Sequence, residues 1–409
     1  MTQRPPVSDW ATDWDHLDPR WREDPYPILD ELRATCPIAH TDRFMGAYLP
    51  TRFEDVRAIA FDTEHFSSRR VAVRENMPPG LGGGASPITS DPPRHHAARR
   101  ALLPPFTPPQ IDKLQSQTRA VCNELIDRFI ANPRCDAAKD YAQHIPVRII
   151  AHMLGVPDQD GDIFRKWIHE IVEAGITDFD TLVKAQDEMT AYLAGYVAQR
   201  QAQPGDDLIS TLLRASYADG EPFKPRHVLG SLRLLLIAGI DTTWSAIGAS
   251  LWHLAKTPAD RRRLVAEPAL IPTAIEEFLR AYSPVTMARE VVKETTINGC
   301  PFKKGEMVML SFPAANRDPE VFANADKVII DRKQNPHAAF GLGIHRCIGS
   351  NLARMELRVA IETWLARVPE FQLDETLPVT WSDGAVRGPR QVPVLLGLRS
   401  TQFTSRPTI

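Results

Sequence analysis

The sequence predicts a mainly helical fold with a minor β portion. From about residue 94 onward, apolar residues recur at spacings of three and four, which is the period of an amphipathic helix. Short β-like runs occur only at 289–297, 307–311 and 393–398. The 409 residues are 43% hydrophobic and include 35 prolines, so the chain can bury a sizeable core and joins many elements by stiff connections.

The N-terminal part has a mixed pattern. Residues 27–34 are typical of a short helix, 47–49 of a strand and 52–60 of a second helix. Residues 71–93 contain four glycines and five prolines with few periodic apolar positions, which predicts a long loop. A loop of that length within a compact chain is commonly functional or mobile.

The remainder reads as a series of helices with recognisable start signals. Asp206 and Asp207 precede Leu208, and Pro258 and Pro272 fall in predicted first turns. The periodic segments are 111–131, 145–155, 162–174, 181–202, 207–217, 225–256, 258–267, 270–282 and 348–367.

Composition excludes several classes of protein. A net charge of −3 excludes a general attraction to nucleic acid or anionic lipid. Five scattered cysteines without a C-x-x-C pair argue against a disulfide framework or a four-cysteine metal site, and favour a reducing, cytoplasmic setting. The first 30 residues lack the apolar core of a signal peptide. Arg233 and Asp241 interrupt the most apolar stretch, so we expect no membrane span.

The strongest chemical signal is the segment FGLGIHRCIG at 340–349, which precedes a predicted helix. Its glycines permit a tight loop that carries Cys347 to the start of that helix. Because N–H groups at a helix start stabilise an anion, we expect a lowered pKa for the Cys347 thiol. A lone thiolate suits a single metal bond or a nucleophile, and a buried, inert cysteine is the alternative.

This segment closely resembles the haem-binding loop of cytochromes P450, F-G-x-G-x-H-x-C-x-G, and other motifs follow in the family's order over nearly the whole chain. The resemblance implies haem b with Cys347 as the thiolate ligand of its iron, and Phe340 packed beside that thiolate. Gly341 and Gly349 would belong to the same cofactor loop, and His345 would contact a haem propionate.

The fold implied by the resemblance is the cytochrome P450 fold, a triangular helix-rich prism with the haem between a distal and a proximal helix. We expect a single P450 domain over residues 1–409, with a β-richer part at about 25–70, a helix-rich remainder and no fused reductase.

A second motif is the stretch LLLIAGIDTT. Small Ala238 and Gly239 let another body approach the helix backbone, and a threonine hydroxyl can bond to the carbonyl four residues earlier. A kinked helix with a solvated aspartate would explain the residues equally well. The stretch resembles the P450 distal helix, A-G-x-D/E-T, which implies that Ala238 lies against the haem. Asp241 would then relay protons inward, and Thr242 would hold the oxygen species at the iron and its water.

A third motif places Glu277 and Arg280 three residues apart on a predicted helix face. A solvated ion pair, worth tenths of a kcal/mol, is the ordinary explanation. The resemblance implies instead the structural E-x-x-R pair of the P450 family, completed by Arg332, with Arg317 as a rival. We expect this network to support the cysteine loop.

A fourth motif, DPPRHHAAR, places His95 and Arg99 four residues apart on one face. An ordinary basic surface helix is the alternative. The segment resembles the family's D-P-P-x-H-x-x-x-R helix, which implies that His95 and Arg99 bind haem propionates together with Arg289 and His345. Paired carboxylates inside a protein need such charge-assisted hydrogen bonds. We expect His96 to be exposed.

The substrate cannot be read from the sequence, but the positions that form pocket walls in the family are mostly apolar here. They are Val71, Leu81, Leu234, Ile237, Ala238, Val285, Met287 and Val386. This set predicts a hydrophobic substrate, such as a terpenoid, aromatic or aliphatic compound. Alternatively, Arg69, Arg70 and Arg74 could bind a substrate carboxylate.

The activity implied by the resemblance is a haem-thiolate monooxygenase that inserts one atom of O2 into a hydrophobic small molecule, by hydroxylation or oxidative demethylation. A separate ferredoxin and reductase would supply electrons to a cytoplasmic monomer that has no nucleic-acid or membrane partner. An H2O2-driven peroxygenase and a non-catalytic haem ligand-binding or sensor protein are alternatives, which Asp241 and Thr242 disfavour. A cysteine hydrolase is remote, because His345 is too close in sequence to aim at Cys347.

Overall fold

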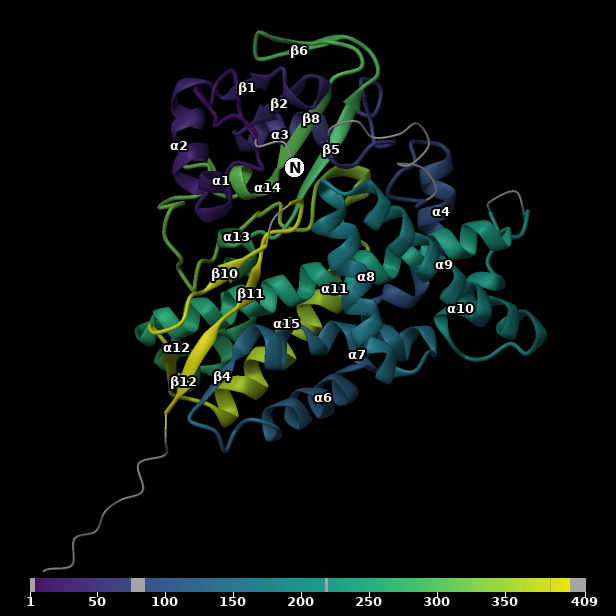
Figure 1. The fold of residues 1–409 in the computed structure, drawn as a ribbon, viewed down its shortest axis with the longest axis vertical. Coiled ribbons are helices and arrows are strands. Elements are labelled where there is room, and N and C mark those ends of the chain that lie inside the picture. The colour runs from purple at the N-terminus through teal and green to yellow at the C-terminus, as the bar shows by residue number, and fades with distance from the viewer. Residues whose placement is uncertain (1–3, 75–84, 218–219, 383, 398–409) are drawn as a thin grey trace, which may run out of the picture.

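A computed structural model describes residues 4–74, 85–217, 220–382 and 384–397. Figure 1 shows a sheet and its covering helices at one end of the molecule and a larger helical part at the other. The predicted fold class, mainly α with minor β, is confirmed. Leu81 lies outside the described residues.

The main sheet has five strands in the order β1-β2-β8-β5-β3. Strands β2 and β8 pair in parallel, and the other neighbours pair antiparallel. The strand bounds are β1 (Ile38–Thr41), β2 (Ala47–Pro50), β3 (Phe66–Ser67), β5 (Thr286–Val291) and β8 (Met307–Ser311). The predicted strands at 47–49 and 307–311 are confirmed, and the run 289–297 divides between β5 and β6.

Three smaller sheets complete the β portion. Strand β12 pairs with β4 and β9, β10 pairs with β11, and β6 pairs with β7, all antiparallel. Their bounds are β4 (Arg134–Asp136), β6 (Thr295–Ile297), β7 (Cys300–Phe302), β9 (Phe371–Leu373), β10 (Thr380–Trp381), β11 (Pro389–Gln391) and β12 (Pro393–Leu396).

The helices follow the predicted series with few differences. The expected helix at 111–131 is two helices, because Pro108 starts a separate short one. The one expected at 207–217 ends at Leu213, after which Ser216 pairs with Pro222. The bounds are α1 (Pro19–Glu23), α2 (Tyr26–Thr35), α3 (Phe53–Phe61), α4 (Arg94–Leu102), α5 (Pro108–Asp112), α6 (Gln115–Asp127), α7 (His144–Leu154), α8 (Gly161–Val172), α9 (Phe179–Ala202), α10 (Leu208–Leu213), α11 (Pro225–Lys256), α12 (Pro258–Ala266), α13 (Ile271–Ala281), α14 (Phe312–Ala315) and α15 (Ser350–Arg367).

Helix α11 crosses the helical part and packs against α7, α9 and α15 (Figure 1). By length and composition alone it could cross a membrane, but 72% of its most apolar window is buried inside the protein. It is therefore a core helix. Pro225 stands in its first turn, where a proline is well tolerated, and Pro258 and Pro272 stand in the first turns of α12 and α13 as predicted.

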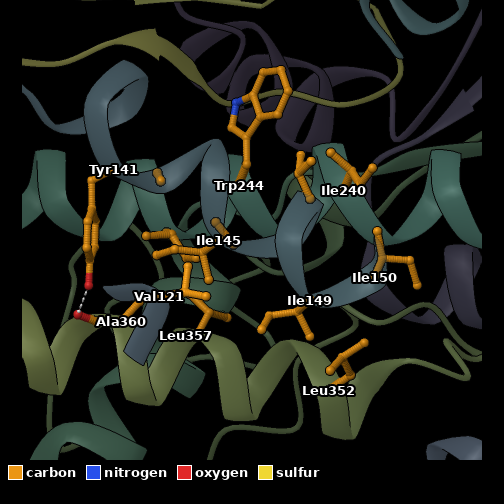
Figure 2. Close-up of a cluster of buried hydrophobic side chains, with 14 of the residues drawn as sticks. Val121, Tyr141, Ile145, Ile149, Ile150, Ile240, Trp244, Leu352, Leu357 and Ala360 are labelled. Carbon is orange, nitrogen blue, oxygen red and sulfur yellow. Dashed lines mark hydrogen bonds between the residues drawn. The ribbon is translucent and has the colours of Figure 1, made fainter. Parts of the chain in front are cut away.

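The core between α11 and α15 fixes the spacing of the two helices (Figure 2). Buried Ile145 and Ile149 of α7 lie between Ile240 of α11 and Leu352 of α15, all within one hydrophobic cluster. The hydroxyl of buried Tyr141 donates to the carbonyl of Ala360 at 2.8 Å and adds a directional contact to this layer. These contacts hold the two helices on which the candidate site is built.

Candidate active site

The loop before α15 presents Cys347. Gly341 and Gly343 have φ of +72° and +67°, a region that residues with side chains rarely adopt. A Cβ on Gly343 would stand 2.5 Å from the Ala60 carbonyl oxygen, so this glycine lets the loop pack on α3. The Cys347 N–H donates to the Phe340 carbonyl at 2.7 Å and closes the loop. A Cβ on Gly349 would lie 3.8 Å from the Cys347 sulfur.

The Cys347 side chain has exposed surface. It nevertheless lies deep within the fold, and burial raises the pKa of its thiol. Its exposed surface therefore faces an internal space. The expectation of a lowered pKa is wrong for the free thiol, because desolvation outweighs the Gly349 N–H and the guanidinium of Arg99. A coordinating metal cation would deprotonate such a thiol outright.

Helix α11 borders open space at its middle. Although most of this helix is buried, Ala238 is exposed, and Ile237, Gly239 and Thr242 are partly exposed. A Cβ on Gly239 would meet nothing closer than 3.8 Å. Since α11 and α15 pack together, a flat apolar group between them would cover these surfaces and the thiol.

Four basic side chains gather beside this space. The His95 and His345 rings lie 4.4 Å apart, and His345 Nε2 lies 2.8 Å from the Ser68 hydroxyl. Both ring nitrogens of buried His95 lack a hydrogen-bond partner. Arg289 is buried and donates to the Ala288 carbonyl at 2.8 Å, and Arg99 donates to the carbonyl of Arg346 at 2.6 Å.

No carboxylate among the described residues pairs with Arg99 or Arg289. Burial lowers the pKa of His95 to about 4, of His345 to about 3 and of Arg289 to about 10, and neighbouring positive charges act in the same direction on both histidines. Buried cations without a counterion are unfavourable, and two propionate carboxylates would satisfy these. Together with the thiol and the bare face of α11, the cluster fits an iron porphyrin. His96 is exposed, as expected.

Asp241 is 1% exposed and does not share the open face of Thr242. Its Oδ1 lies 2.8 Å from a terminal nitrogen of Arg390, although neither carboxylate oxygen makes a well-aligned hydrogen bond. Burial raises the pKa of Asp241 to about 6, with Arg390 opposing and Glu173 adding to the rise. The Thr242 hydroxyl donates to the Ala238 carbonyl at 2.8 Å, as the sequence analysis expects of a threonine in this helix.

Sequence analysis missed Arg390 and Glu173. Arg390 of β11 donates through Nε to Glu173 at 2.7 Å and through a terminal nitrogen to the Ser245 hydroxyl at 3.1 Å. Its guanidinium lies 4.4 Å from the Trp244 ring centroid. Glu173 immediately follows α8. The one local signal was an arginine within the otherwise apolar C-terminal strand segment.

A buried ion network supports the cysteine loop. Arg280 donates twice to Glu277 at 2.8 Å, and Arg332 donates to the same carboxylate at 2.9 Å. Glu277 and Arg280 are fully buried. The rival Arg317 lies instead over the Tyr26 ring at 3.4 Å.

The network reaches the loop through backbone contacts. Arg280 also donates to the Asn316 carbonyl at 2.9 Å, and the Asn316 side chain accepts from the Ala338 N–H at 2.6 Å. Ala338 precedes Phe340 by two residues. The ion network therefore fixes the start of the loop whose end holds Cys347.

The described pocket residues lie on four separate segments of the chain, at residues 71, 234–238, 285–287 and 386. Leu234 and Ile237 are partly exposed on α11. Val285 and Val386 form an isolated antiparallel bridge, and Met287 follows on β5. Val71 accepts from the Ala288 N–H at 2.9 Å, which brings it to the same strand. Arg69 is not available to a substrate, because Glu290 holds it through two hydrogen bonds.

Comparisons with known proteins agree with this geometry. The family model described as Cytochrome P450 matches residues 175–378. The "Mycinamicin IV hydroxylase/epoxidase" of Micromonospora griseorubida is 34% identical over 89% of this chain and 94% of its own length. The "Vitamin D(3) 25-hydroxylase" of Pseudonocardia autotrophica is 34% identical over 92% of this chain and 95% of its own. The solved structure of the polyketide synthase cytochrome P450 PksS from Bacillus subtilis has a TM-score of 0.86 at 29% identity, covering 94% of this chain and all of that one.

Removing the Glu277 carboxylate should destabilise the protein. We expect Glu277→Gln to lower the free energy of unfolding by about 3–5 kcal/mol, because it leaves two buried guanidiniums without a counterion. The adjacent Glu276 is the matched control: its side chain is 31% exposed and pairs with Arg354, so Glu276→Gln should cost only about 1 kcal/mol. Denaturant unfolding measures both, and equal losses would contradict the assignment.

The pKa of Asp241 should move in opposite directions in two variants. Arg390→Met removes the nearby guanidinium and should raise this pKa above about 6, whereas Glu173→Gln removes a repelling charge and should lower it. Infrared difference spectra across a pH titration report the protonated carboxyl, with Asp241→Asn identifying its band. Shifts of the same sign in both variants would refute the network.

Proposed function

Because the chain belongs to the cytochrome P450 family and is a P450 monooxygenase, we propose that it inserts one atom of O2 into a hydrophobic small molecule by hydroxylation or oxidative demethylation. The observation that carries this proposal is a pair of adjacent residues on α11: Asp241 is buried, and Thr242 lies on the bare face of the helix. A haem-based sensor needs no proton relay, and the pairing of an acid with an alcohol at Asp241 and Thr242 also disfavours a peroxygenase.

Haem b is the cofactor of the family, and bound haem supplies the activation of O2. Cys347 would hold its iron from the side of α15, with Phe340, Gly341 and Gly349 shaping the loop around the sulfur. His95, Arg99, Arg289 and His345 would hold the two propionates, and Ala238 would lie against the opposite face. Of these side chains, His95 lacks a hydrogen-bond partner among the described residues, and Arg99 and Arg289 bond only to backbone carbonyls.

Proton delivery divides between two adjacent residues. Asp241 has a pKa of about 6, so it can take up and release a proton near neutral pH without a large energy difference. Since the Thr242 hydrogen is given to the Ala238 carbonyl, the hydroxyl oxygen can accept a hydrogen bond from a water beside Ala238. Arg390 lies 2.6 Å from Glu173 and 2.8 Å from Asp241, so one guanidinium links the two acids.

The apolar side chains around the site support a hydrophobic substrate, through Leu234, Ile237, Val285, Met287 and Val386. The names of the two curated relatives contain hydroxylase, which supports hydroxylation over demethylation. Electrons would come from a separate ferredoxin and reductase. Residues 1–409 would form a single domain, and the protein would act as a monomer in the cytoplasm.

Replacing the thiolate should change the haem spectrum. The reduced, CO-bound protein should show the absorption typical of thiolate-bound haem, and Cys347→His should replace it with that of nitrogen-bound haem. Cys36 is the control, since it bonds to the Ile38 carbonyl away from the site, and Cys36→Ser should leave the spectrum unchanged. A thiolate spectrum in Cys347→His would contradict the assignment of Cys347 as the ligand of the haem iron.

Removing the Thr242 hydroxyl should uncouple the reaction. Thr242→Ala should keep haem and substrate binding, but divert electrons to H2O2 and lower product formed per reducing equivalent by roughly 10-fold or more. Thr243, the buried neighbour, provides the matched control Thr243→Ala. Parallel measurement of cofactor consumption, H2O2 and product gives the ratio; unchanged coupling in Thr242→Ala would count against the relay.

A further inference from the structure

Many buried or partly buried arginines among the described residues are matched with carboxylates. Others are compensated in another way, as Arg317 is by the ring of Tyr26. A guanidinium removed from water without a counterion costs free energy, so such pairing is expected. The matched pairs include Arg33–Asp30, Arg43–Asp15, Arg200–Asp207, Arg261–Glu370, Arg280–Glu277 and Arg390–Glu173. An arginine that breaks this rule marks a place where an anion from outside the chain would fit. Arg99 and Arg289 break it at the candidate propionate site, as described above.

Arg74 breaks the rule outside that site. Its one hydrogen bond within the described part of the chain is a long one, 3.4 Å to the Gly175 carbonyl, and it forms no ion pair there. Burial lowers the pKa of this guanidinium, and no acidic group opposes the effect. Arg233 is different, because it donates to Thr190 at 3.0 Å and Asp187 is close enough to raise its pKa. Arg74 is thus a cation without a counterion among the described residues.

The Arg74 side chain lines a cavity together with Val73, Ile176, Met287 and Ala385. Except for the guanidinium, these named walls are apolar. Ile176 belongs to the short segment between α8 and α9, and Met287 belongs to β5. The cavity therefore lies between the segment that connects α8 to α9 and strand β5, which carries the predicted pocket residue Met287.

His16 supplies a second polar group to this cavity. His16 is partly buried, and its Nδ1 atom is buried without a hydrogen-bond partner among the described residues. Burial lowers the His16 pKa to about 4, although Asp15 acts against the shift, so the imidazole is neutral at pH 7 and can offer one N–H. The neighbouring Asp15 cannot serve Arg74, because it accepts from Arg4 and Arg43. An anion would thus meet a guanidinium and a neutral donor, with no acid free to repel it.

Strand β5 connects this cavity to the haem side. Met287 lines the cavity, and Arg289, two residues further along the strand, belongs to the basic cluster. Two residues of a strand span roughly 7 Å. A ligand with one end on Arg74 could therefore extend its body along Val285 and Met287 toward the haem.

We propose that Arg74 binds the carboxylate of the substrate, with His16 as a second donor, so that the enzyme acts on a hydrophobic acid and oxidises it away from its acid group. This inference rests on the proposed monooxygenase function. A guanidinium binds a carboxylate through two parallel hydrogen bonds, which fixes the orientation of the rest of the molecule. An ester of the same acid would lose the charge and leave Arg74 unpaired.

Calorimetric titration of the ferric holoenzyme tests this directly with two matched probe pairs, lauric acid against methyl laurate and abietic acid against methyl abietate. In the unaltered protein, at least one acid should bind 10-fold or more tighter than its ester. Arg74→Gln should abolish that preference, and Arg74→Lys should restore part of it. Arg233→Gln is the control for loss of a partly buried arginine and should keep the preference.

The outcomes separate this inference from the proposed function. Failure of all four compounds to bind, equal binding of acid and ester, or an acid preference that survives Arg74→Gln would overturn the role of Arg74. The CO spectrum of the same samples reports the thiolate ligand independently, and its retention in Arg74→Gln shows that the variant is folded. Loss of the thiolate spectrum in the unaltered protein would instead sink the monooxygenase proposal, whatever the calorimetry shows.

Discussion

The geometry of the site depends on one buried carboxylate. Glu277 is shared by Arg280 and Arg332, so the network carries one more positive charge than negative. Backbone carbonyls compensate for that excess: Arg280 donates to Asn316, Ala325 and Lys327, and Arg332 donates to Ala323. Guanidinium groups can do this because each offers five N–H donors in a fixed plane. The irregular segment before the cysteine loop is thereby folded around two cations, and it needs no regular secondary structure of its own.

Elsewhere in the protein, arginines without a carboxylate partner indicate where an anionic ligand would bind. Cations without carboxylates occur at the basic cluster of Arg99 and Arg289 and at Arg74, while ordinary ion pairs occupy most other buried arginines. A fold can hold such groups only if their burial is offset by stability gained elsewhere, or by a bound anion. The apolar core that packs α11 and α15 together contributes this stability.

The sequence predicted what local signals determine. The glycines of the cysteine loop, the first-turn prolines of α12 and α13 and the period of the apolar residues in α11 each act within a few residues, and the structure reproduces the elements they predicted. Contacts between distant segments were beyond reach: nothing near Arg390 indicates that it would meet Ser245, 145 residues away. The resemblance had already favoured Arg332 over Arg317, and in the structure Arg332 is the residue that donates to Glu277. The Cys347 pKa was mispredicted because a helix start is a local feature, whereas desolvation comes from the whole fold.

The proton path and the substrate cavity share one short segment. Glu173, directly after α8, holds Arg390 and through it Asp241, while Gly175 accepts from Arg74 and Ile176 lines the cavity. These residues lie within four positions of one another, so a displacement of the segment cannot change one contact and spare the others. A substrate that reorganises Arg74 would therefore also act on Glu173, and withdrawing Glu173 from Arg390 strengthens the hold of that guanidinium on Asp241. Residues 173–176 are therefore a common support for Asp241, through Arg390, and for the cavity that Arg74 lines.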